Sequence, residues 1–595
     1  MRSLVEKAGL GIFLAGFAVF LASFFLVDFQ LTEAGIEQQL GDKGRESLLK
    51  SVAAPILEKR FGSSFSFSQE LEKTIHQANA QILKDFGISE TEKEKIVLSQ
   101  GTPFPVEFSI EKAISALEEG EQAVFKSSQL RAYGGWMDGR SYNSKEQLLN
   151  DLNQNILNIN QGIVRDKGFD EYRTKSLKYS LAKEATVGTV KDHPVLFLLF
   201  TYGLAIVGAL LYFYARSQTT EGISNDRIHF SSMMHRGWIG VLTGTFLIGF
   251  YIILYFFPQH MTAWVTMVDP ISFFLKGSEA GYFFLYGWLY TLCVLVMGIR
   301  MMVKWRHSNY HLVRTLSVMF FQTAFAFLIP EILVRLNQPY FDFKNIWPLD
   351  YDFFFEYELD KLIESGALGM FMLVWGIALI VIAVPVLVYF FGKRWYCSWV
   401  CGCGGLAETL GDPYRQLSDK SLKAWKVERW LIHSVLVFAV IMTIGVLYTY
   451  FTSSSQFLGI STYDIRSWYG FLIGSVFAGV VGTGFYPLMG NRVWCRFGCP
   501  LAAYLGLVQR FKSRFRITTN GGQCISCGNC STYCEMGIDV RWYAQRGQNI
   551  VRASCVGCGI CASVCPRGVL KLENSDEETR FNEPILIGNK DVTIK

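Results

Sequence analysis

Charged residues are scarce in this chain of 595 residues: they make up 18% of it, against 50% hydrophobic residues. A soluble protein of this length carries nearer a quarter charged residues. The hydrophobic residues collect in uninterrupted runs that are long enough to cross a bilayer, which takes about 20 residues. The composition therefore excludes a purely soluble enzyme. The modest net charge of +5 gives no reason to expect nucleic acid as a partner.

Cysteine is missing from residues 28–192, and that region has no C-x2-C-H site for attaching haem. A secreted disulfide scaffold would scatter cysteines through its extracellular part. Instead, thirteen of the fourteen cysteines follow residue 396 and stand in tight groups. This clustering is typical of metal ligation in a reducing compartment.

Eight stretches qualify as membrane spans by length and hydropathy, at about residues 8–28, 194–215, 237–257, 281–303, 315–336, 367–392, 430–451 and 467–489. No A-x-A-like cleavage site follows the first stretch, so we interpret it as a retained anchor. Lys and Arg favour the cytoplasmic side of a membrane. Residues 393–429 are basic, whereas residues 338–366 carry seven acids against two lysines. We therefore expect both termini in the cytoplasm and residues 29–192 outside it, in the periplasm if the cell has an outer membrane.

Two cysteine runs near the C-terminus share the spacing C-x2-C-x2-C-x3-C. With this spacing, three thiolates of a run hold one cubane cluster and the fourth crosses to the other cluster. The predicted ligands of the first 4Fe–4S cluster are Cys524, Cys527, Cys530 and Cys565, and those of the second are Cys555, Cys558, Cys561 and Cys534. Paired zinc sites are the alternative, but two complete runs in tandem favour iron–sulfur clusters. Glu535 stands where the motif usually has proline.

A second constellation lies closer to the predicted spans. The segments 394–401 and 492–499 align at a constant offset of 98 residues, and each follows the cytoplasmic end of a span. Both C-x3-C pairs are therefore expected at the same membrane face. The thiolates of Cys397, Cys401, Cys495 and Cys499 would complete a third iron–sulfur cluster, which Cys403 could join or tune. The alternative is that these cysteines are small interface residues without metal.

With these motifs the chain resembles the membrane-bound polyferredoxins of the NapH and NosR type, a group that includes the cytochrome-oxidase maturation protein CcoG. The resemblance covers about residues 365–572 and rests on the paired C-x3-C motifs, of which 495–500 has the form C-x3-C-P, and on the two runs that follow. It implies electron transfer between cytoplasmic or quinone-linked donors and a partner redox system. The first pair continues with Gly402-Cys403 instead of proline, and the outer region lacks the family's S/T-G-A-T pattern, so no flavin is expected.

The expected fold is mainly α: a polytopic membrane protein with about eight transmembrane helices, a helical extracytoplasmic domain and a C-terminal bacterial-type two-cluster ferredoxin module of α+β type. The predicted parts are an anchor at 1–28, the extracytoplasmic domain at 29–192, a seven-helix region at 193–490 with a cytoplasmic cysteine loop at 393–429, the C-x3-C-P segment and ferredoxin module at 491–572, and a polar tail at 573–595.

The sequence thus predicts an electron-transfer component of a bacterial inner membrane, with no evident residues for bond-making catalysis. Its expected partners are membrane lipid, quinone, a periplasmic or membrane redox protein, and an acidic ferredoxin or flavodoxin attracted by Arg541, Arg546, Arg552 and Arg567. Two alternatives stay open. One is a metal-ion (copper) reductase in the assembly of another enzyme, with Cys403 binding the ion; the other is a redox-sensing membrane protein that signals to its outer domain.

Two residues inside the predicted spans, Cys293 and Glu331, belong to none of these motifs. Cys293 is expected to serve packing. Glu331, near the outer end of the fifth span, is a candidate for proton transfer or quinone binding, because ionisable residues close to the membrane interior are costly.

Overall fold

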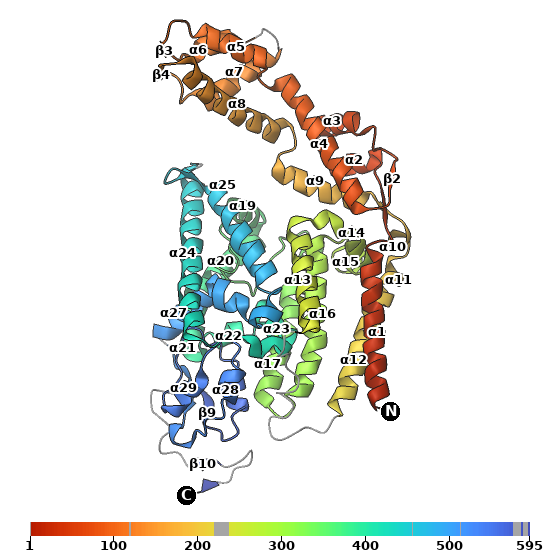
Figure 1. Cartoon of the computed structure of the whole chain (residues 1–595), viewed down its shortest axis with the longest axis vertical. Coiled ribbons are helices and arrows are strands. Elements are labelled where there is room, and N and C mark those ends of the chain that lie inside the picture. Colours follow the sequence, from red (N-terminus) through yellow and green to blue (C-terminus); the bar gives the residue numbers. More distant parts are fainter. Residues whose placement is uncertain are drawn as a thin grey trace. The chain divides into compact units, whose positions relative to one another are not determined.

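The computed structural model describes residues 2–117, 121–218, 237–454, 456–511, 513–574, 585–586 and 593–594, so most of the predicted tail at 573–595 lies outside the described residues. The chain divides into two compact units. One comprises Phe20–Phe197 and Pro258–Met267 and is here named the cysteine-free unit. The other comprises Met1–Val19, Leu198–Phe257 and Val268–Lys595 and is named the cysteine unit. Helices dominate both units, which confirms the expected fold class (Figure 1).

The cysteine-free unit is built on long amphipathic helices. Its main helices are α4 (Ser64–Phe86), α8 (Lys145–Lys167) and α9 (Glu171–Glu184). Each begins at a side-chain cap, from Ser63, Ser144 and Asp170 respectively, which satisfies a backbone N–H of the first turn. A small antiparallel sheet joins the two ends of this unit, because β1 (Asp28–Gln30) pairs with both β2 (Arg60–Phe61) and β5 (Thr186–Val187).

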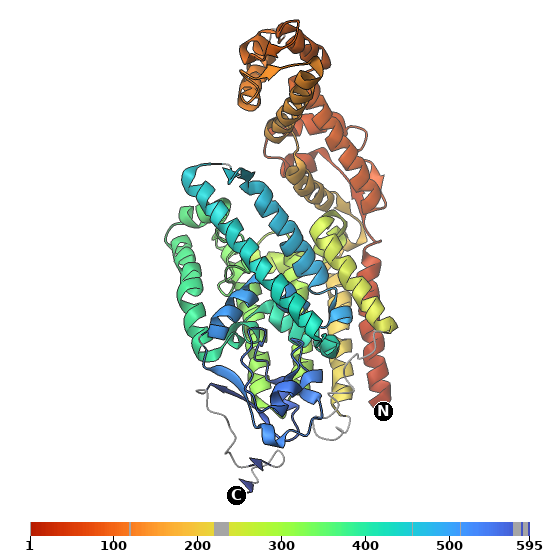
Figure 2. The ribbon, with the colours of Figure 1, turned by 60° about the vertical axis from the view of Figure 1, so that its left-hand side comes forward.

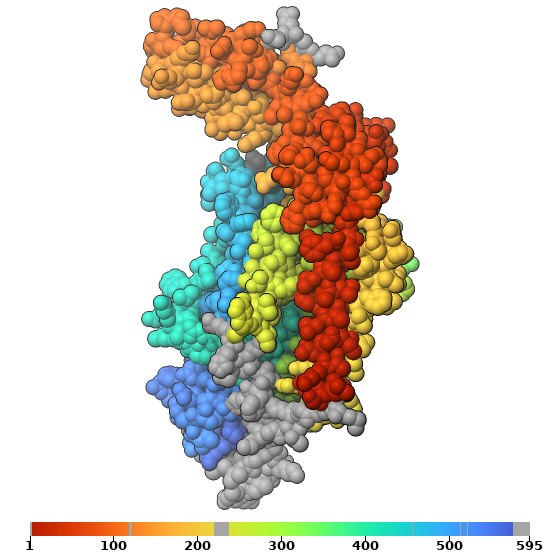
Figure 3. All heavy atoms as spheres, turned by 45° about the vertical axis from the view of Figure 1, so that its right-hand side comes forward, coloured from red at the N-terminus to blue at the C-terminus, as the bar shows by residue number. Residues whose placement is uncertain are grey.

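Within the described residues, seven helical stretches are long and apolar enough to cross a membrane. They are Ser3–Ser23 in α1, Pro194–Ser217 (α11, η1 and α12), Trp238–Phe256 (α13), Tyr282–Lys304 (α16), Asn309–Arg335 (α17, η3 and α18), Gly366–Phe391 (α20, η4 and α21) and Leu422–Thr452 (α24). Figure 3 shows α1 and α13 at the surface of the molecule. The exposed side chains of both are largely hydrophobic, Leu14 and Leu242 among them, which suits contact with lipid.

The eighth predicted span, at 467–489, is not one continuous α-helix. It is divided between the end of α25 (Thr462–Tyr469), the π-helix η6 (Gly470–Val481) and the short α26 (Tyr486–Met489). Glycine lowers helix stability, and the backbone at Gly479 lies so close to the ring of Tyr255 that a Cβ atom there would be 2.3 Å from it. This stretch is therefore an irregular helix that packs closely against a neighbouring aromatic ring.

The ferredoxin module is the α+β part of the cysteine unit. Strand β8 (Phe515–Thr519) pairs antiparallel with β9 (Leu570–Asn574), in a register from Phe515 with Asn574 to Thr519 with Leu570. Three short α-helices lie between the strands: α28 (Asn529–Thr532), α29 (Val540–Gln545) and α30 (Ile560–Ser563). Figures 1 and 2 place the module at one end of the helices of its unit.

Candidate iron–sulfur centres

The first cysteine group surrounds one cavity of the ferredoxin module. Cys524, Cys527, Cys530 and Cys565 all line it, so the fold brings the last cysteine of the second run to the first three of the first run. This is the crossed set that the spacing predicts. Cys527 is exposed and Cys524 is half-buried, which places this group at the surface of the module.

The second cysteine group is more deeply buried. Cys555 and Cys561 are buried, Cys558 is half-buried, and the thiols of Cys555 and Cys561 both lie within electrostatic range of Cys534. The N–H of Ile538 donates to Sγ of Cys534 at 3.4 Å. Backbone hydrogen bonds to sulfur are a recurrent feature of cluster-binding thiolates. The second predicted set is therefore also brought together.

The repeated C-x3-C pairs meet in a separate cavity. Its lining contains five thiols, those of Cys397, Cys401, Cys403, Cys495 and Cys499. The first three come from α22 (Arg394–Cys397), the segment after it and α23 (Gly402–Thr409). The last two come from the π-helix η7 (Trp494–Gly498) and its C-cap. The 98-residue repeat thus folds into one site, although its two copies are far apart in sequence.

The chemistry of this cavity fits an iron–sulfur cluster. Thiolates are the ligands that iron–sulfur clusters prefer, and the other lining residues are mainly apolar. Ala502 N–H donates to Sγ of Cys499 at 3.4 Å, and Nη1 of Arg492 lies 3.7 Å from Sγ of Cys495. Nε of Arg492 has no hydrogen-bond partner among the described residues, which leaves a buried donor beside these cysteines. Cys293 lies elsewhere, against Val294, Val318 and Leu406, as expected for a packing residue.

All three groups belong to one continuous apolar core. Buried cysteines of the five-thiol cavity and of both ferredoxin groups contact the same cluster of hydrophobic side chains, which includes Val384, Leu505, Phe515 and Ile517. The ferredoxin module is therefore packed against the helices through α21 (Val384–Phe391) and α27 (Pro500–Phe511). This packing fixes the spacing between the three groups.

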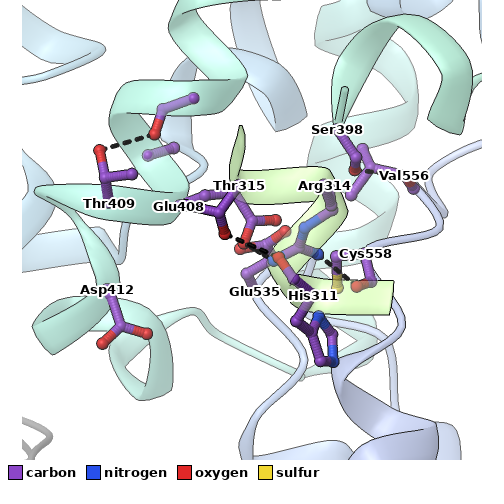
Figure 4. A network of polar contacts seen from close by, with 12 residues as sticks. His311, Arg314, Thr315, Ser398, Glu408, Thr409, Asp412, Glu535, Val556 and Cys558 are labelled. Atoms are coloured by element: carbon purple, nitrogen blue, oxygen red, sulfur yellow. Dashed lines mark hydrogen bonds and ion pairs between the residues drawn. The ribbon is translucent and has the colours of Figure 1, made fainter. Parts of the chain in front are cut away.

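A buried network of charges, which the sequence reasoning missed, lies next to these groups. Glu408 accepts from Arg314 at 2.7 Å, from Arg415 at 3.1 Å and from Arg492 at 2.8 Å. Figure 4 shows Glu408 beside Arg314. Glu535 pairs with Arg415 at 2.6 Å and with Arg492 at 3.0 Å. Burial alone would raise the pKa of Glu408, but the three guanidinium groups outweigh it and hold that pKa well below its usual value. Glu408 is therefore a carboxylate.

A second branch of the network surrounds Asp412. Its carboxylate pairs with Arg300 at 2.9 Å, with Lys304 at 2.7 Å and with Arg415 at 3.3 Å. Burial opposes ionisation here too, yet these three cations lower the pKa of Asp412. The only sequence signal for the network was Glu535, in the place of the usual proline. Its partners come from separate helices and loops, so no local motif connects them.

One candidate cation site consists of Glu408, Glu535 and Cys558, whose ligand atoms lie within 4.8 Å of one another. The two carboxylates are already paired with Arg314, Arg415 and Arg492. A cation would have to displace these guanidinium groups, so the trio is a structural network and not a cation site.

The second cysteine loop is held by side chains of the surrounding helices. Four successive carbonyls accept hydrogen bonds: Cys555 O from Gln509 at 3.2 Å, Val556 O from Ser398 at 2.7 Å, Gly557 O from Tyr310 at 2.9 Å, and Cys558 O from Arg314. Tyr310 and Arg314 belong to α17 (Asn309–Phe320), whereas Gln509 belongs to α27. We name these four donors the carbonyl clamp.

The remaining residues singled out in the sequence lie as follows. Glu331 is buried, with a carboxylate oxygen 4.0 Å from Nζ of Lys276. Arg541 and Arg567 line the first cavity.

Comparison with known proteins agrees with this chemistry. Residues 523–570 match a family described as "4Fe-4S dicluster domain", and residues 371–421 and 470–518 match one described as "4Fe-4S binding domain". The second match covers both copies of the C-x3-C repeat. No solved structure matches the chain.

A curated relative is the "Putative electron transport protein YccM" of Escherichia coli (strain K12), which is 26% identical over 172 residues. The matched region covers 27% of this chain and 47% of that protein, so the chain spans about half the length of the relative. Together with the seven apolar helices, these matches show that the chain is similar to 4Fe–4S proteins and to a putative electron transport protein, and that it has helices suited to a membrane.

Proposed function

We propose that the chain is a membrane-bound electron carrier that exchanges electrons with a soluble cytoplasmic partner at one end and with quinone or a partner redox protein at the other. The supporting observation is the order of burial. Cys527 is exposed, Cys555 and Cys561 are buried, and the five-thiol cavity is buried within the same apolar core. Iron–sulfur clusters bound to these cysteines would supply one-electron chemistry.

The proposed ligands follow the three cysteine groups. Cys524, Cys527, Cys530 and Cys565 hold the first 4Fe–4S cluster, Cys555, Cys558, Cys561 and Cys534 hold the second, and Cys397, Cys401, Cys495 and Cys499 hold a third iron–sulfur cluster. The protein's own part is to keep the groups at fixed spacing and to exclude water from the inner two. The resemblance of its motifs to those of the NapH, NosR and CcoG proteins supports this proposal.

The surface around the first group suits a negatively charged partner. Arg541 and Arg567 are exposed beside its cavity, and the apolar side chain of Ile525 is also exposed there. A basic rim with apolar contacts steers and holds an acidic protein such as a ferredoxin or flavodoxin. Replacing Arg541 and Arg567 by glutamine should slow electron uptake at low salt and reduce its salt dependence. Arg131→Gln, in the cysteine-free unit, is the matched control.

The decisive test is iron and acid-labile sulfide per chain after anaerobic purification. Three cubanes give about twelve irons, at four each. Cys495→Ser should lower the iron content and remove one signal of the reduced protein, whereas Cys293→Ser, which changes a cysteine outside the three groups, should leave both unchanged. About eight irons in the unaltered protein, with no effect of Cys495→Ser, would limit cluster binding to the ferredoxin module.

One observation favours a second candidate, reduction of a metal ion such as copper during assembly of another enzyme. A cubane takes four thiolates, yet the cavity is lined by five, Cys403 being the additional one. A copper titration of unaltered protein and Cys403→Ser, each with its iron–sulfur clusters reduced beforehand so that they supply the electron, separates the two functions. Copper bound and reduced only when Cys403 is present supports the reductase, and equal behaviour of both proteins supports the electron carrier.

The proposed location is a bacterial inner membrane, with both termini in the cytoplasm and residues 29–192 outside. The loop charges described above support this orientation. Labelling of single introduced cysteines in intact cells tests it: Tyr172→Cys, at an exposed position of the cysteine-free unit, should react with an impermeant reagent. Reaction only after lysis would reverse the topology.

A further inference from the structure

The carbonyl clamp binds the backbone of one loop of the ferredoxin module. Residues 555–558 each present their carbonyl oxygen to a different side chain, and all four donors come from outside the module's own strands and helices. Figure 4 shows two of them, Ser398 at Val556 and Arg314 at Cys558. Docking of the ferredoxin module onto the helices would not by itself require a hydrogen bond at every carbonyl of this short loop.

The donors are themselves held in place. Gln509 accepts from the N–H of Lys393 at 2.7 Å, Nε1 of Trp399 donates to the hydroxyl of Tyr310 at 3.4 Å, and Arg314 is paired with Glu408. Ser398 is buried, with 1% of its surface exposed. Side chains fixed in this way impose an orientation on the group that they bind.

The amide groups of the same loop face the other way. The N–H of Gly557 lies close enough to the thiol of Cys555 to interact with it electrostatically. Among the described residues, the N–H groups of Val556, Cys558 and Gly559 donate to no backbone carbonyl. Positive φ angles of 62° at Gly557 and 81° at Gly559 allow the chain to turn so tightly. The carbonyl oxygens of this loop are thus directed toward the clamp, and its amide groups are available to donate to the cysteine sulfurs.

We propose that Gln509, Ser398, Tyr310 and Arg314 are positioning residues that orient the 555–559 backbone toward the second iron–sulfur cluster and thereby raise its reduction potential. The inference rests on the proposed function, since it takes a cluster to be bound by Cys555, Cys558, Cys561 and Cys534. Hydrogen bonds to sulfur stabilise the more negative reduced state and are one of the determinants of a cluster's potential. Loosening the clamp should therefore make reduction harder.

The test uses the full chain with two uncharged changes, Ser398→Ala and Tyr310→Phe, singly and together. Neither changes the net charge, so a shift in potential reports on backbone orientation. The matched controls are Ser272→Ala, whose hydroxyl donates to Ser278 O at 2.8 Å, and Tyr504→Phe, whose hydroxyl donates to Ile380 O at 3.1 Å. A redox titration followed by electron paramagnetic resonance gives the potential of each signal.

The double variant should lower the potential of one ferredoxin signal by an amount corresponding to about a tenfold change in the reduction equilibrium, which is about 59 mV for one electron. The other ferredoxin signal and both controls should not move. Equal potentials in the double variant and the unaltered protein would overturn the clamp proposal, as would equal shifts in the controls.

A second measurement separates this proposal from the function on which it rests. Hydrogen exchange of residues 555–559 in the metal-free chain should be faster in the double variant than in the two controls, because the clamp is a property of the protein alone. Unaltered protein that binds no cluster at the second group would refute the proposed function, and unchanged exchange in the double variant would refute the clamp.

Discussion

Replacing Arg415 by methionine tests the buried charge network directly. Methionine keeps most of the apolar stem of arginine and removes its charge. Arg415 pairs with Glu408, Asp412 and Glu535, all at most 4% exposed in their side chains. Removal of one partner of a buried ion pair costs about 3–5 kcal/mol, because the remaining charge stays buried without compensation.

The expected cost here is at the lower end of that range. Each carboxylate keeps another cation: Glu408 keeps Arg314 and Arg492, Asp412 keeps Arg300 and Lys304, and Glu535 keeps Arg492. We therefore expect the free energy of unfolding to fall by about 3 kcal/mol. The assay is denaturant unfolding in detergent micelles, followed by tryptophan fluorescence.

Two comparisons make the result decisive. Arg216→Met removes an ion pair to Glu6 in the same unit, at 3.2 Å but with side chains 48% and 27% exposed, and should cost at most about 1 kcal/mol. The double variant Arg415→Met with Glu535→Gln should lose less stability than the sum of its single changes. A cost for Arg415→Met no larger than that for Arg216→Met, or strict additivity in the double variant, would refute the reasoning.

Three further predictions concern other parts of the chain. Gly559→Ala should reduce iron and sulfide per chain, because a Cβ at this φ of 81° would lie 2.9 Å from the ring of Tyr310, whereas Gly522→Ala, in open space, should not; equal iron contents would contradict this. Burial, with the charge of Lys178, lowers the pKa of His260 from 6.5 to about 4. The stability that neutral His260 contributes above pH 6.5 should therefore be lost as the pH falls through about 4, seen as faster hydrogen exchange in α4, and His260→Phe should abolish this dependence. Burial and the charges of Asp352, Asp342 and Glu358 raise the pKa of Asp350 from 3.8 to about 8. Protonated Asp350 should thus favour the folded state, and the free energy of unfolding should fall as the pH rises from about 4 to about 8; an unchanged slope in Asp350→Asn would show that another group titrates.

Much of the architecture could be predicted from local patterns. Long apolar runs predict helices because, in a bilayer, every backbone polar group must be satisfied within its own segment. Among the predicted spans, this reasoning was wrong only about the shape of the stretch at 467–489. That stretch contains a π-helix, packed closely at Gly479, and is not a regular α-helix. The spacing of the two cysteine runs predicted the crossing of Cys565 to the first group, since three closely spaced ligands reach one cluster and the fourth cannot.

The sequence by itself determined the ligand chemistry and the helices, because both depend on neighbours along the chain. The tertiary structure alone decided which distant residues meet. It joined the two C-x3-C pairs and Cys403 in one cavity, and it assembled the Arg–Glu network and the carbonyl clamp from separate elements. Such contacts leave no periodic pattern in the sequence. A buried glutamate such as Glu408 cannot be told from an exposed one until the fold brings Arg314, Arg415 and Arg492 to it.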